Sequence, residues 1–454
     1  MDGYYAFMLV AATLVLMMTV PALALFYGGM SRSKSVLNMM MMSFGALAVV
    51  AIVYVLWGWS MSYSAGAGDD VAGLFANPFT LFGLDDVDPG SYVFVAFQMT
   101  FAVITAALIS GAVADRVRFS SWMVFVPLWV TLSYFPLAHM VWGGGFLSPL
   151  NENGLSAILF GFEDGLAKVV PQDYAGGTVV HINAGVAGLV LVLLIGRRLG
   201  FGKEPMKPHN LTLTMIGAGL LWFGWFGFNV GSIVFVEGDG GEKDIAQFMS
   251  ETGVTWINTT IATSAAMLAW LLVEKIRDGK GTSLGAASGI VAGLVAITPA
   301  CGAVDVYGAI AIGAAAGALC ALAVGLKYRF GYDDSLDVVG VHLVGGIVGT
   351  VMIGFVSSGS APGGIDGLLY GGGAEPLVVQ VLTALVAIAW SAVATLAVGL
   401  LIKATLGWRI TDEDEAEGID FVEHGESAYD LGTGGGARRS SVLQGSTASE
   451  GARA

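Results

Sequence analysis

The chain has 454 residues, of which 55% are hydrophobic and only 12% are charged, and its mean hydropathy is +0.75. Soluble domains are about 45–50% apolar and about 25% charged, so a soluble globular protein is excluded because its surface would lack polar side chains. The apolar content is too high for a disordered chain, and two cysteines are too few for a disulfide scaffold. An integral membrane protein remains, with a formal net charge of −15 to locate.

Eleven apolar stretches are long enough to cross about 30 Å of hydrocarbon as helices. In chain order they are residues 4–29, 36–62, 91–113, 119–140, 177–195, 211–235, 254–273, 284–300, 306–326, 338–356 and 377–402. Most lack alternating polar positions, which favours helices over an outer-membrane barrel. No basic segment precedes the first stretch, so we expect no cleaved signal peptide. The predicted fold is an all-α membrane protein with eleven transmembrane helices.

The basic residues predict the orientation. With the N-terminus outside and the C-terminus inside, 18 of the 20 Lys and Arg residues fall on the inner side, and only Lys168 and Lys243 fall outside. Of the carboxylates, 18 lie outside and 17 inside, which leaves net charges of −16 outside and +1 inside. An anionic outer mouth concentrates cations. The alternative is that these charges solvate the protein in a salty habitat, where their field is screened.

A pattern V-H-x-x-x-G-x-x-G occurs twice, around His181 in the fifth stretch and around His342 in the tenth. The fifth stretch runs inward and the tenth outward. The two motifs therefore lie five helices apart on helices of opposite direction. An inverted repeat of 5 + 5 helices produces this relation. We place the two repeats at about residues 4–195 and 211–356, followed by one extra helix that returns the chain to the cytoplasm.

Three domains follow from this topology. Residues 1–402 are expected to form the membrane domain, 403–430 a cytoplasmic regulatory tail, and 431–454 a disordered Gly/Ser-rich extension.

Ionisable residues inside membrane spans indicate function by default. Of the five histidines, only His181 and His342 lie clearly inside a span. His139 ends the fourth span and is expected to be structural, whereas His209 and His424 are expected at the surface. A lone intramembrane histidine is often a hydrogen-bonded core residue, but two in related positions favour a functional pair.

Several long segments resemble the ammonium transporter family (Amt/Mep/Rh). They are FQMTFAVITAALISGAVADRVRF at 97–119, HMVWGGG at 139–145, DYAGGTVVHINAGVAG at 173–188, GWFGFNVGS at 224–232 and DVVGVHLVGGIVGT at 337–350. The tail sequence EGIDFVEHGESAYD at 417–430 is similar to that of the bacterial and archaeal Amt branch. The resemblance covers about residues 4–430, and no matched position departs from the family's pattern.

The resemblance implies an outer recruitment site for ammonium. Trp142 and Ser232 match the tryptophan and serine of that site, with Phe101 beside them. Asp173 matches the family's nearby aspartate, which is held there chiefly for structure and electrostatics. A tryptophan face attracts a cation by about 0.5–2 kcal/mol, and a serine hydroxyl can accept a hydrogen bond that potassium cannot donate.

The resemblance also implies a gate and a pore. Phe101 and Phe228 match the stacked rings that close the family's pore, and His181 and His342 match its twin histidines. The neighbouring aromatic residues are Phe97 and Trp225. An apolar pore repels an unpaired cation far more strongly than a small neutral amine. Passing ammonia and moving the proton by another route therefore rejects sodium and potassium; whether transport is electrogenic stays open.

The implied partners are ammonium or ammonia, membrane lipid, two further copies of the chain in a homotrimer, and a PII-type regulatory protein at the cytoplasmic face of the cell membrane. We expect no cofactor, no metal site and no nucleic acid, and an enzyme is disfavoured. A water channel would need paired Asn-Pro-Ala motifs, and a sodium symporter would need oxygen ligands at broken helices. An ammonium sensor of the same fold is an open alternative, although the tail is too short for an attached signalling domain.

Overall fold

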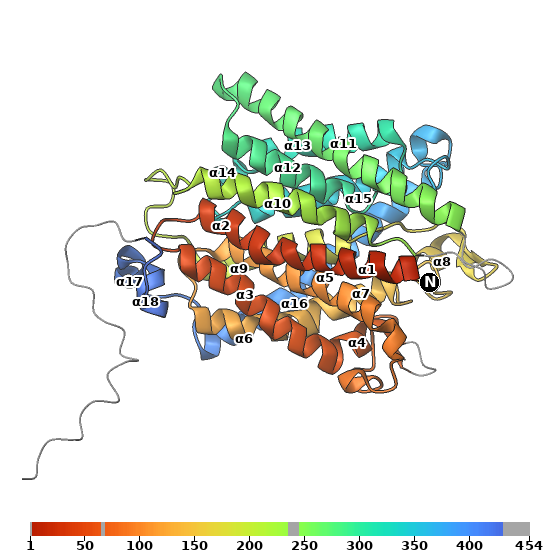
Figure 1. The fold of residues 1–454 in the computed structure, drawn as a ribbon, viewed down its shortest axis with the longest axis horizontal. Helices are drawn as coiled ribbons and strands as arrows, with labels where there is room; N and C mark the ends of the chain where they lie inside the picture. Colours follow the sequence, from red (N-terminus) through yellow and green to blue (C-terminus); the bar gives the residue numbers. More distant parts are fainter. Residues whose placement is uncertain (1, 65–68, 235–244, 430–454) are drawn as a thin grey trace, which may run out of the picture.

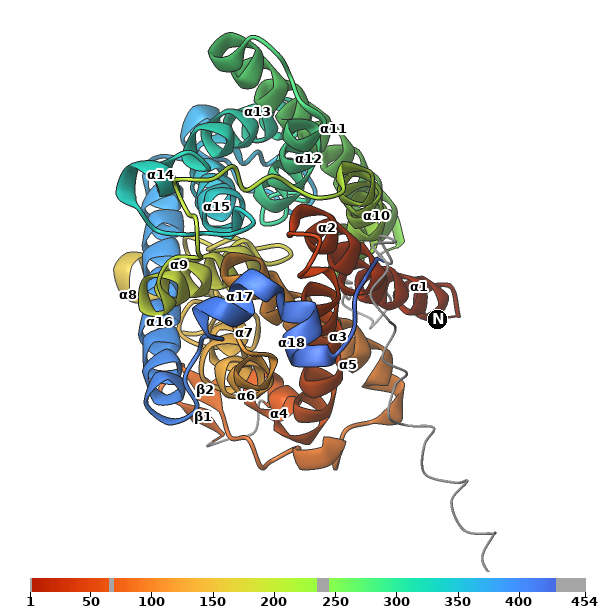
Figure 2. The same cartoon turned by 90° about the vertical axis from the view of Figure 1, so that its left-hand side faces the viewer.

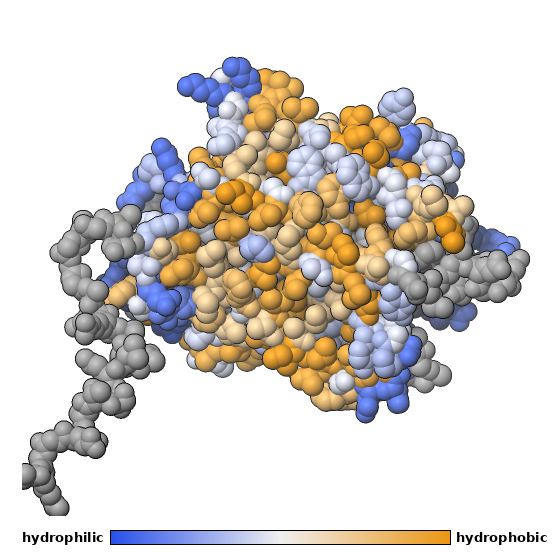
Figure 3. Space-filling view, viewed as in Figure 1, coloured by the Kyte–Doolittle hydropathy of each residue, from blue (hydrophilic) through white to orange (hydrophobic). Residues whose placement is uncertain are grey.

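The computed structural model describes residues 2–64, 69–234 and 245–429. The chain forms an elongated bundle in which most helices run along the long axis (Figure 1). Helix α1 (Asp2–Met17) begins at one end, and α17 (Asp412–Glu417) and α18 (Ile419–His424) lie at the other. Apolar side chains cover the middle of the face in Figure 3, and hydrophilic ones gather toward its ends. This is the surface that a membrane-spanning bundle requires.

Within the described ranges, ten helical units are long and apolar enough to cross a membrane. Seven of them join two or three segments, in which η marks a short π- or 3₁₀-helical turn. In chain order the units consist of α1, η1 (Met18–Leu23) and α2 (Ala24–Met30); α3 (Val36–Val53), η2 (Tyr54–Gly58) and α4 (Trp59–Tyr63); η4 (Pro89–Ser91), α5 (Tyr92–Ile109) and η5 (Ser110–Val113); α6 (Phe119–Trp129), η6 (Val130–Tyr134) and α7 (Phe135–Trp142); η7 (Gly177–Ile182) and α9 (Asn183–Ile195); α10 (Leu211–Val230); α11 (Ile245–Asp278); α13 (Val306–Ala323) and α14 (Leu326–Phe330); η8 (Val339–Leu343) and α15 (Val344–Val356); and α16 (Glu375–Thr405).

Three predicted stretches differ from the helices observed. The stretch 211–235 runs beyond the end of α10 at Val230, and residue 235 lies outside the described residues. The stretch 284–300 corresponds to α12 (Ser283–Ile297), whose 15 residues make it shorter than the other ten units. Pro299 follows this helix, and proline cannot donate the next backbone hydrogen bond. The stretch 254–273 lies inside the longer α11, because polar residues continue that helix beyond its apolar run.

The connections carry little regular structure. The described residues contain two small antiparallel hairpins: β1 (Asp70–Val71) pairs with β2 (Phe75–Ala76), and β3 (Phe162–Glu163) pairs with β4 (Leu166–Ala167). The remaining short helices are η3 (Phe82–Leu84), α8 (Leu155–Phe160) and η9 (Leu368–Tyr370).

Seen from the tail end, the elements from α10 to α15 group on one side, and α16 runs along the flank of the bundle (Figure 2). Small residues allow close packing inside that group. Gly313 and Gly317 of α13 lie against the backbone of Ala262 and Ala266 of α11, where a Cβ atom would collide with carbonyl oxygens. Helices associate in lipid through such contacts, since lipid tails are as apolar as the helices themselves.

The tail packs against the ends of two helices. The Asp420 carboxylate accepts hydrogen bonds from the amides of Leu37 and Asn38 at 3.0 and 2.8 Å, where α3 begins. The Glu423 carboxylate accepts one from the amide of Phe119 at 3.0 Å, where α6 begins. Carboxylates are favourable at helix N-termini because four amides there lack helical partners. Two acidic side chains thus fasten α18 to the bundle.

Two histidines that were expected at the surface contribute to this docking. His424 Nε2 lies 3.0 Å from Asn38 Oδ1, and both His424 and His209 are half-buried. His209 lies between the carbonyl oxygen of Ser31 and the hydroxyl of Tyr429, at 3.0 and 2.9 Å. The predicted extension 431–454 lies outside the described residues.

Candidate functional site

A cavity of about 310 Å³ lies at the end of the bundle where α1 begins. Its wall includes Trp142, which ends α7, and Ser232, which follows α10. Asp173, Phe97 and Phe101 also line it. The structure therefore brings together the residues that the sequence predicts for the outer part of the path.

Asp173 organises this cavity through its backbone and its carboxylate. Trp142 Nε1 donates to the Asp173 carbonyl oxygen at 2.9 Å. The carboxylate accepts the amides of Gly176, Gly177 and Thr178 at 2.6–2.9 Å and also the Thr178 hydroxyl. Burial raises the pKa of Asp173, and the bonds that lower it do not compensate. Both carboxylate oxygens are thus engaged with the start of η7.

Ser232 is half-buried at the cavity wall, and its hydroxyl donates to the carbonyl oxygen of Phe228 at 2.8 Å. Because a hydroxyl has one hydrogen and two lone pairs, its oxygen can still accept a hydrogen bond from a donor in the cavity.

Two stacked phenylalanine rings lie at the inner limit of the cavity, of which Phe101 lines the cavity itself. The rings of Phe101 and Phe228 stack with centroids 4.0 Å apart and planes at 10°. Phe101 meets the ring of Trp142 edge-on at 6.1 Å and the ring of Phe97 at 4.9 Å. Phe101 and Phe228 are each only 1% exposed. The stacked rings therefore separate the cavity from the space on their other side.

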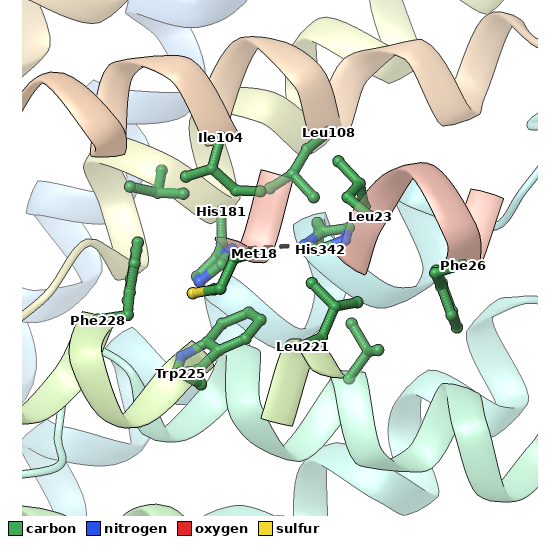
Figure 4. Close-up of a pocket in the computed structure, with 12 residues that line it drawn as sticks. Met18, Leu23, Phe26, Ile104, Leu108, His181, Leu221, Trp225, Phe228 and His342 are labelled. Carbon is green, nitrogen blue, oxygen red and sulfur yellow. Dashed lines mark hydrogen bonds between the residues drawn. The ribbon is translucent and has the colours of Figure 1, made fainter. Parts of the chain in front are cut away.

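Below the stack is a passage with a volume of about 10 Å³ (Figure 4), roughly the room that one water needs. His181 and His342 lie along it, between Phe228 at one end and Phe26 at the other. The two Nδ1 atoms are 3.4 Å apart, so one ring donates to the other. Nε2 of His181 is buried and has no hydrogen-bond partner among the described residues.

Both histidines sit in π-helical turns, His181 in η7 and His342 in η8. The glycines four residues later explain how these turns meet. A Cβ on Gly185 would collide with the backbone of Leu343, and a Cβ on Gly346 would lie 3.1 Å from the Cβ of His181. Each repeat of the motif thus supplies the gap into which the other packs, which brings the two rings together.

Sequence reasoning missed Asp334, which relates to His342 as Asp173 relates to His181. Each aspartate stands eight residues before its histidine. The Asp334 carboxylate accepts the amides of Val338 and Val339 at 3.0 and 2.8 Å and caps the helix that carries His342. Burial, reinforced by nearby carboxylate charge, raises the pKa of Asp334 to about 6. The spacing D-x₇-H, present in both motifs, was the signal that could have revealed it.

Trp225 forms part of the passage wall and is 2% exposed. Its ring stacks on that of His181 with centroids 5.5 Å apart and planes at 18°. Its indole nitrogen donates to the hydroxyl of Thr298 at 2.8 Å. The sequence placed Trp225 in this neighbourhood but gave no indication of Thr298.

Among the described residues, no three His, Cys, Asp or Glu side chains gather in a way that could hold a metal ion. Cys301 and Cys320 are buried free thiols.

A comparison with family models matches residues 6–429 to the ammonium transporter family. The chain belongs to this family. The ammonium transporter of Mycobacterium tuberculosis is 48% identical over 471 aligned positions, covering 96% of this chain and 91% of the relative. The transporter Amt1 of Archaeoglobus fulgidus is 37% identical, covering 94% and 99%. The family predicted from the sequence is therefore confirmed.

Solved structures of the family share the fold. Mep2 of Saccharomyces cerevisiae matches with a TM-score of 0.75 and 31% identity, over 90% of this chain and 88% of that one. A protein described as a sensor Amt protein matches with a TM-score of 0.79 and 27% identity, over 93% and 98%. This member of the ammonium transporter family is a multi-pass membrane transporter and not an enzyme.

Proposed function

We propose that the chain takes up ammonium by recruiting NH₄⁺ in the outer cavity, removing a proton there and conducting NH₃ through the narrow passage. The order of groups along one path carries this proposal. A cavity of about 310 Å³ ends at the Phe101–Phe228 stack, and a passage of about 10 Å³ follows. The two histidines are the only ionisable groups among the 12 residues lining that passage. A path that narrows and loses polarity in this way suits a neutral molecule.

Recruitment is assigned to Trp142 and Ser232. The indole face offers a cation–π attraction of about 0.5–2 kcal/mol, and the Ser232 oxygen retains a free lone pair. Neither carries a charge that would trap the ion. Asp173 contributes a negative potential at the same wall while its oxygens stay engaged with the backbone.

The apolar passage supplies selectivity. Transferring an unpaired cation into such a medium costs tens of kcal/mol in the Born limit, whereas a small neutral amine costs only a few. Ammonium can shed a proton and become neutral, but sodium and potassium cannot. Deprotonation therefore takes place above the Phe101–Phe228 stack, where ammonium gives its proton to water in the cavity, and only ammonia enters the passage.

The histidine pair serves the passage in one of two ways. The bond between the two Nδ1 atoms leaves one Nε2 with a proton and the other with a lone pair. Such a pair can hold ammonia by its free nitrogens, or it can pass a proton by exchanging tautomers. The Nε2 of His181, which has no partner among the described residues, is the atom we assign to this contact.

The topology that we propose has eleven transmembrane helices, with α12 as the eighth, the N-terminus outside and the C-terminus inside. The opposite positions of α1 and α17 in the bundle support an odd number of crossings. A 5 + 5 inverted repeat is supported by the two histidine motifs, each headed by a capping aspartate. Residues 1–402 then form the conducting domain and 403–430 the regulatory tail.

We also propose that the protein works as a homotrimer in the cell membrane, with a PII-type protein binding its cytoplasmic face. Family membership supports this assembly. The docking of α18 through Asp420 and Glu423 supports a tail that senses the state of the bundle.

The test is a current measurement on purified protein in liposomes. We expect a transient current or uptake with ammonium and none with potassium. His181→Ala should either abolish ammonium transport or admit potassium, and if it changes neither, the assignment of the histidines is wrong. Wild-type uptake with no net charge moved would exclude a proton relay and leave electroneutral passage of ammonia.

A sensor of ammonium is the second candidate, because one solved structure of similar fold is described as a sensor Amt protein. A sensor would bind ammonium at the outer cavity without sustained flux. Ammonium-dependent fluorescence or calorimetric binding in a protein that carries no flux would favour this function over transport.

A further inference from the structure

A series of buried hydrogen bonds holds the indole nitrogen of Trp225. Trp225 Nε1 donates to Thr298 Oγ1 at 2.8 Å. The Thr298 hydroxyl lies 2.8 Å from the carbonyl oxygen of Leu294 and 3.3 Å from Asn229 Oδ1. Asn229 Nδ2 donates to Thr259 Oγ1 at 3.0 Å. These hydrogen bonds link helices α10 and α11 with the end of α12.

Each residue in this series of hydrogen bonds is shielded from solvent. Thr298, Asn229 and Thr259 are 0% exposed, and Trp225 is 2% exposed. A buried indole has one donor and no acceptor, so the bond to Thr298 satisfies its only polar atom. Trp225 lines the passage, and its ring stacks on that of His181, beside which it lies in Figure 4.

We propose that Thr298 is a positioning residue that keeps the indole N–H of Trp225 out of the passage and thereby keeps the passage apolar. The inference rests on the proposed function and deepens it, since it assigns selectivity to a residue that does not line the path. Without the Thr298 oxygen, the indole N–H would be buried and unpaired, which is unfavourable. A water in the passage, or Nε2 of His181, would then compete for it and bring a polar group into the path.

The test compares three variants reconstituted in liposomes. Thr298→Val removes the acceptor and keeps the shape, whereas Thr298→Ser keeps the acceptor. Thr383→Val is the matched control, because the Thr383 hydroxyl is equally buried but has no hydrogen-bond partner in the described part of the chain. The readouts are osmotic water permeability by stopped-flow light scattering and the ratio of potassium to ammonium current. We expect Thr298→Val to raise both at least fivefold and the other two variants to match the wild type.

A second pair of variants separates positioning from general packing. Trp225→Phe removes the N–H, so adding Thr298→Val to it should change neither readout further. This pair also decides the matter if Thr298→Val alone does not fold, since the double variant leaves no unpaired donor. The inference is overturned if Thr298→Val behaves as wild type, if it has the same effect beside Trp225→Phe, or if the double variant also fails to fold. A wild type that moves no ammonium would overturn the proposed function instead, while the water permeabilities would still test Thr298.

Discussion

The rings of Phe101 and Phe228 lie 4.0 Å apart and nearly parallel, yet their other neighbours are on opposite sides of the stack. The ring of Phe101 contacts that of Trp142 in the cavity, with centroids 6.1 Å apart. The ring of Phe228 contacts that of His181 in the passage, with centroids 6.3 Å apart. The two rings come from α5 and α10, so a small change between these helices would separate them. The stack therefore contacts both the residues of the cavity and those of the passage.

Phe228→Ala is expected to impair selectivity more than Phe101→Ala, because Phe228 also packs on the histidine and on Trp225. Both rings are equally buried, so each truncation removes a similar packing energy of about 3–5 kcal/mol. We expect the ammonium-to-potassium current ratio to fall at least tenfold for Phe228→Ala and less for Phe101→Ala. Equal losses would show that only the contact between the two rings matters.

Gly185→Ala should disturb the packing between the two helical turns that carry His181 and His342. The new Cβ would meet the backbone of Leu343, which cannot rotate away. Overpacking of this kind costs about 1–3 kcal/mol, and we expect a lower melting temperature in detergent together with slower ammonium uptake. The control is Gly219→Ala on α10, where an added Cβ meets nothing within 4 Å and where alanine favours the helix. A Gly185→Ala protein as stable and active as the wild type would contradict the close contact.

Glu415→Gln should loosen the tail. The Glu415 side chain is 0% exposed and lies 3.2 Å from Arg32 and 2.9 Å from Arg409. A hydrogen bond to a charged group contributes about 1.5–3 kcal/mol, so hydrogen exchange across residues 411–429 should accelerate by at least tenfold. The exposed Glu413, changed to Gln, is the matched control and should leave exchange unaltered. Unchanged exchange in Glu415→Gln would mean that Asp420 and Glu423 hold the tail by themselves.

Stability should depend on pH through Asp334. Burial raises the pKa of this carboxyl to about 6 in the folded protein, against about 3.9 in an unfolded chain. The folded state therefore binds the proton more tightly, and its stabilising effect is complete below about pH 4 and lost as the pH rises through 6. Between these values the free energy of unfolding should fall by up to about 1.4 kcal/mol per pH unit. Melting temperatures of the wild type and Asp334→Asn at pH 4.5 and 7 test this, and equal slopes would argue against it.

The pKa values of the buried carboxylates Asp115 and Asp333 are shifted in the opposite direction to that of Asp334. Burial alone would raise their pKa, but the charge and hydrogen bonds of Arg198 outweigh it and lower the pKa of both. Their stabilising effect is present above about pH 4 and is lost as the pH falls further. Acid below pH 4 should therefore unfold the Arg198 cluster whether or not Asp334 is replaced.

Hydropathy predicted the spans well because the membrane imposes one condition on every crossing segment, namely internally paired backbone and apolar side chains. Hydropathy gave the wrong helix ends where a property other than apolarity decides where the helix ends. The polar residues of α11 continue the helix beyond the apolar run, and Pro299 ends α12 early. Hydropathy also cannot see the π-helical turns at His181 and His342, since these depend on how the two motifs pack.

The residues that line the site could be predicted from the sequence, whereas the residues that hold them in place could not. His181 and His342 share a pattern that is visible along the chain, and the family resemblance added the aromatic residues. Thr298 is 73 residues from Trp225, so only the packing of α12 beside α10 brings them together. Asp334 was overlooked because a carboxylate near an inner connection looks like an ordinary surface residue until its burial is known.

The small volume of the passage has a consequence for the molecule that enters it. A space of about 10 Å³ has room for about one water-sized molecule, so the segment between Phe228 and Phe26 cannot hold a solute together with a shell of water. A molecule in this segment therefore has to leave its hydration water behind.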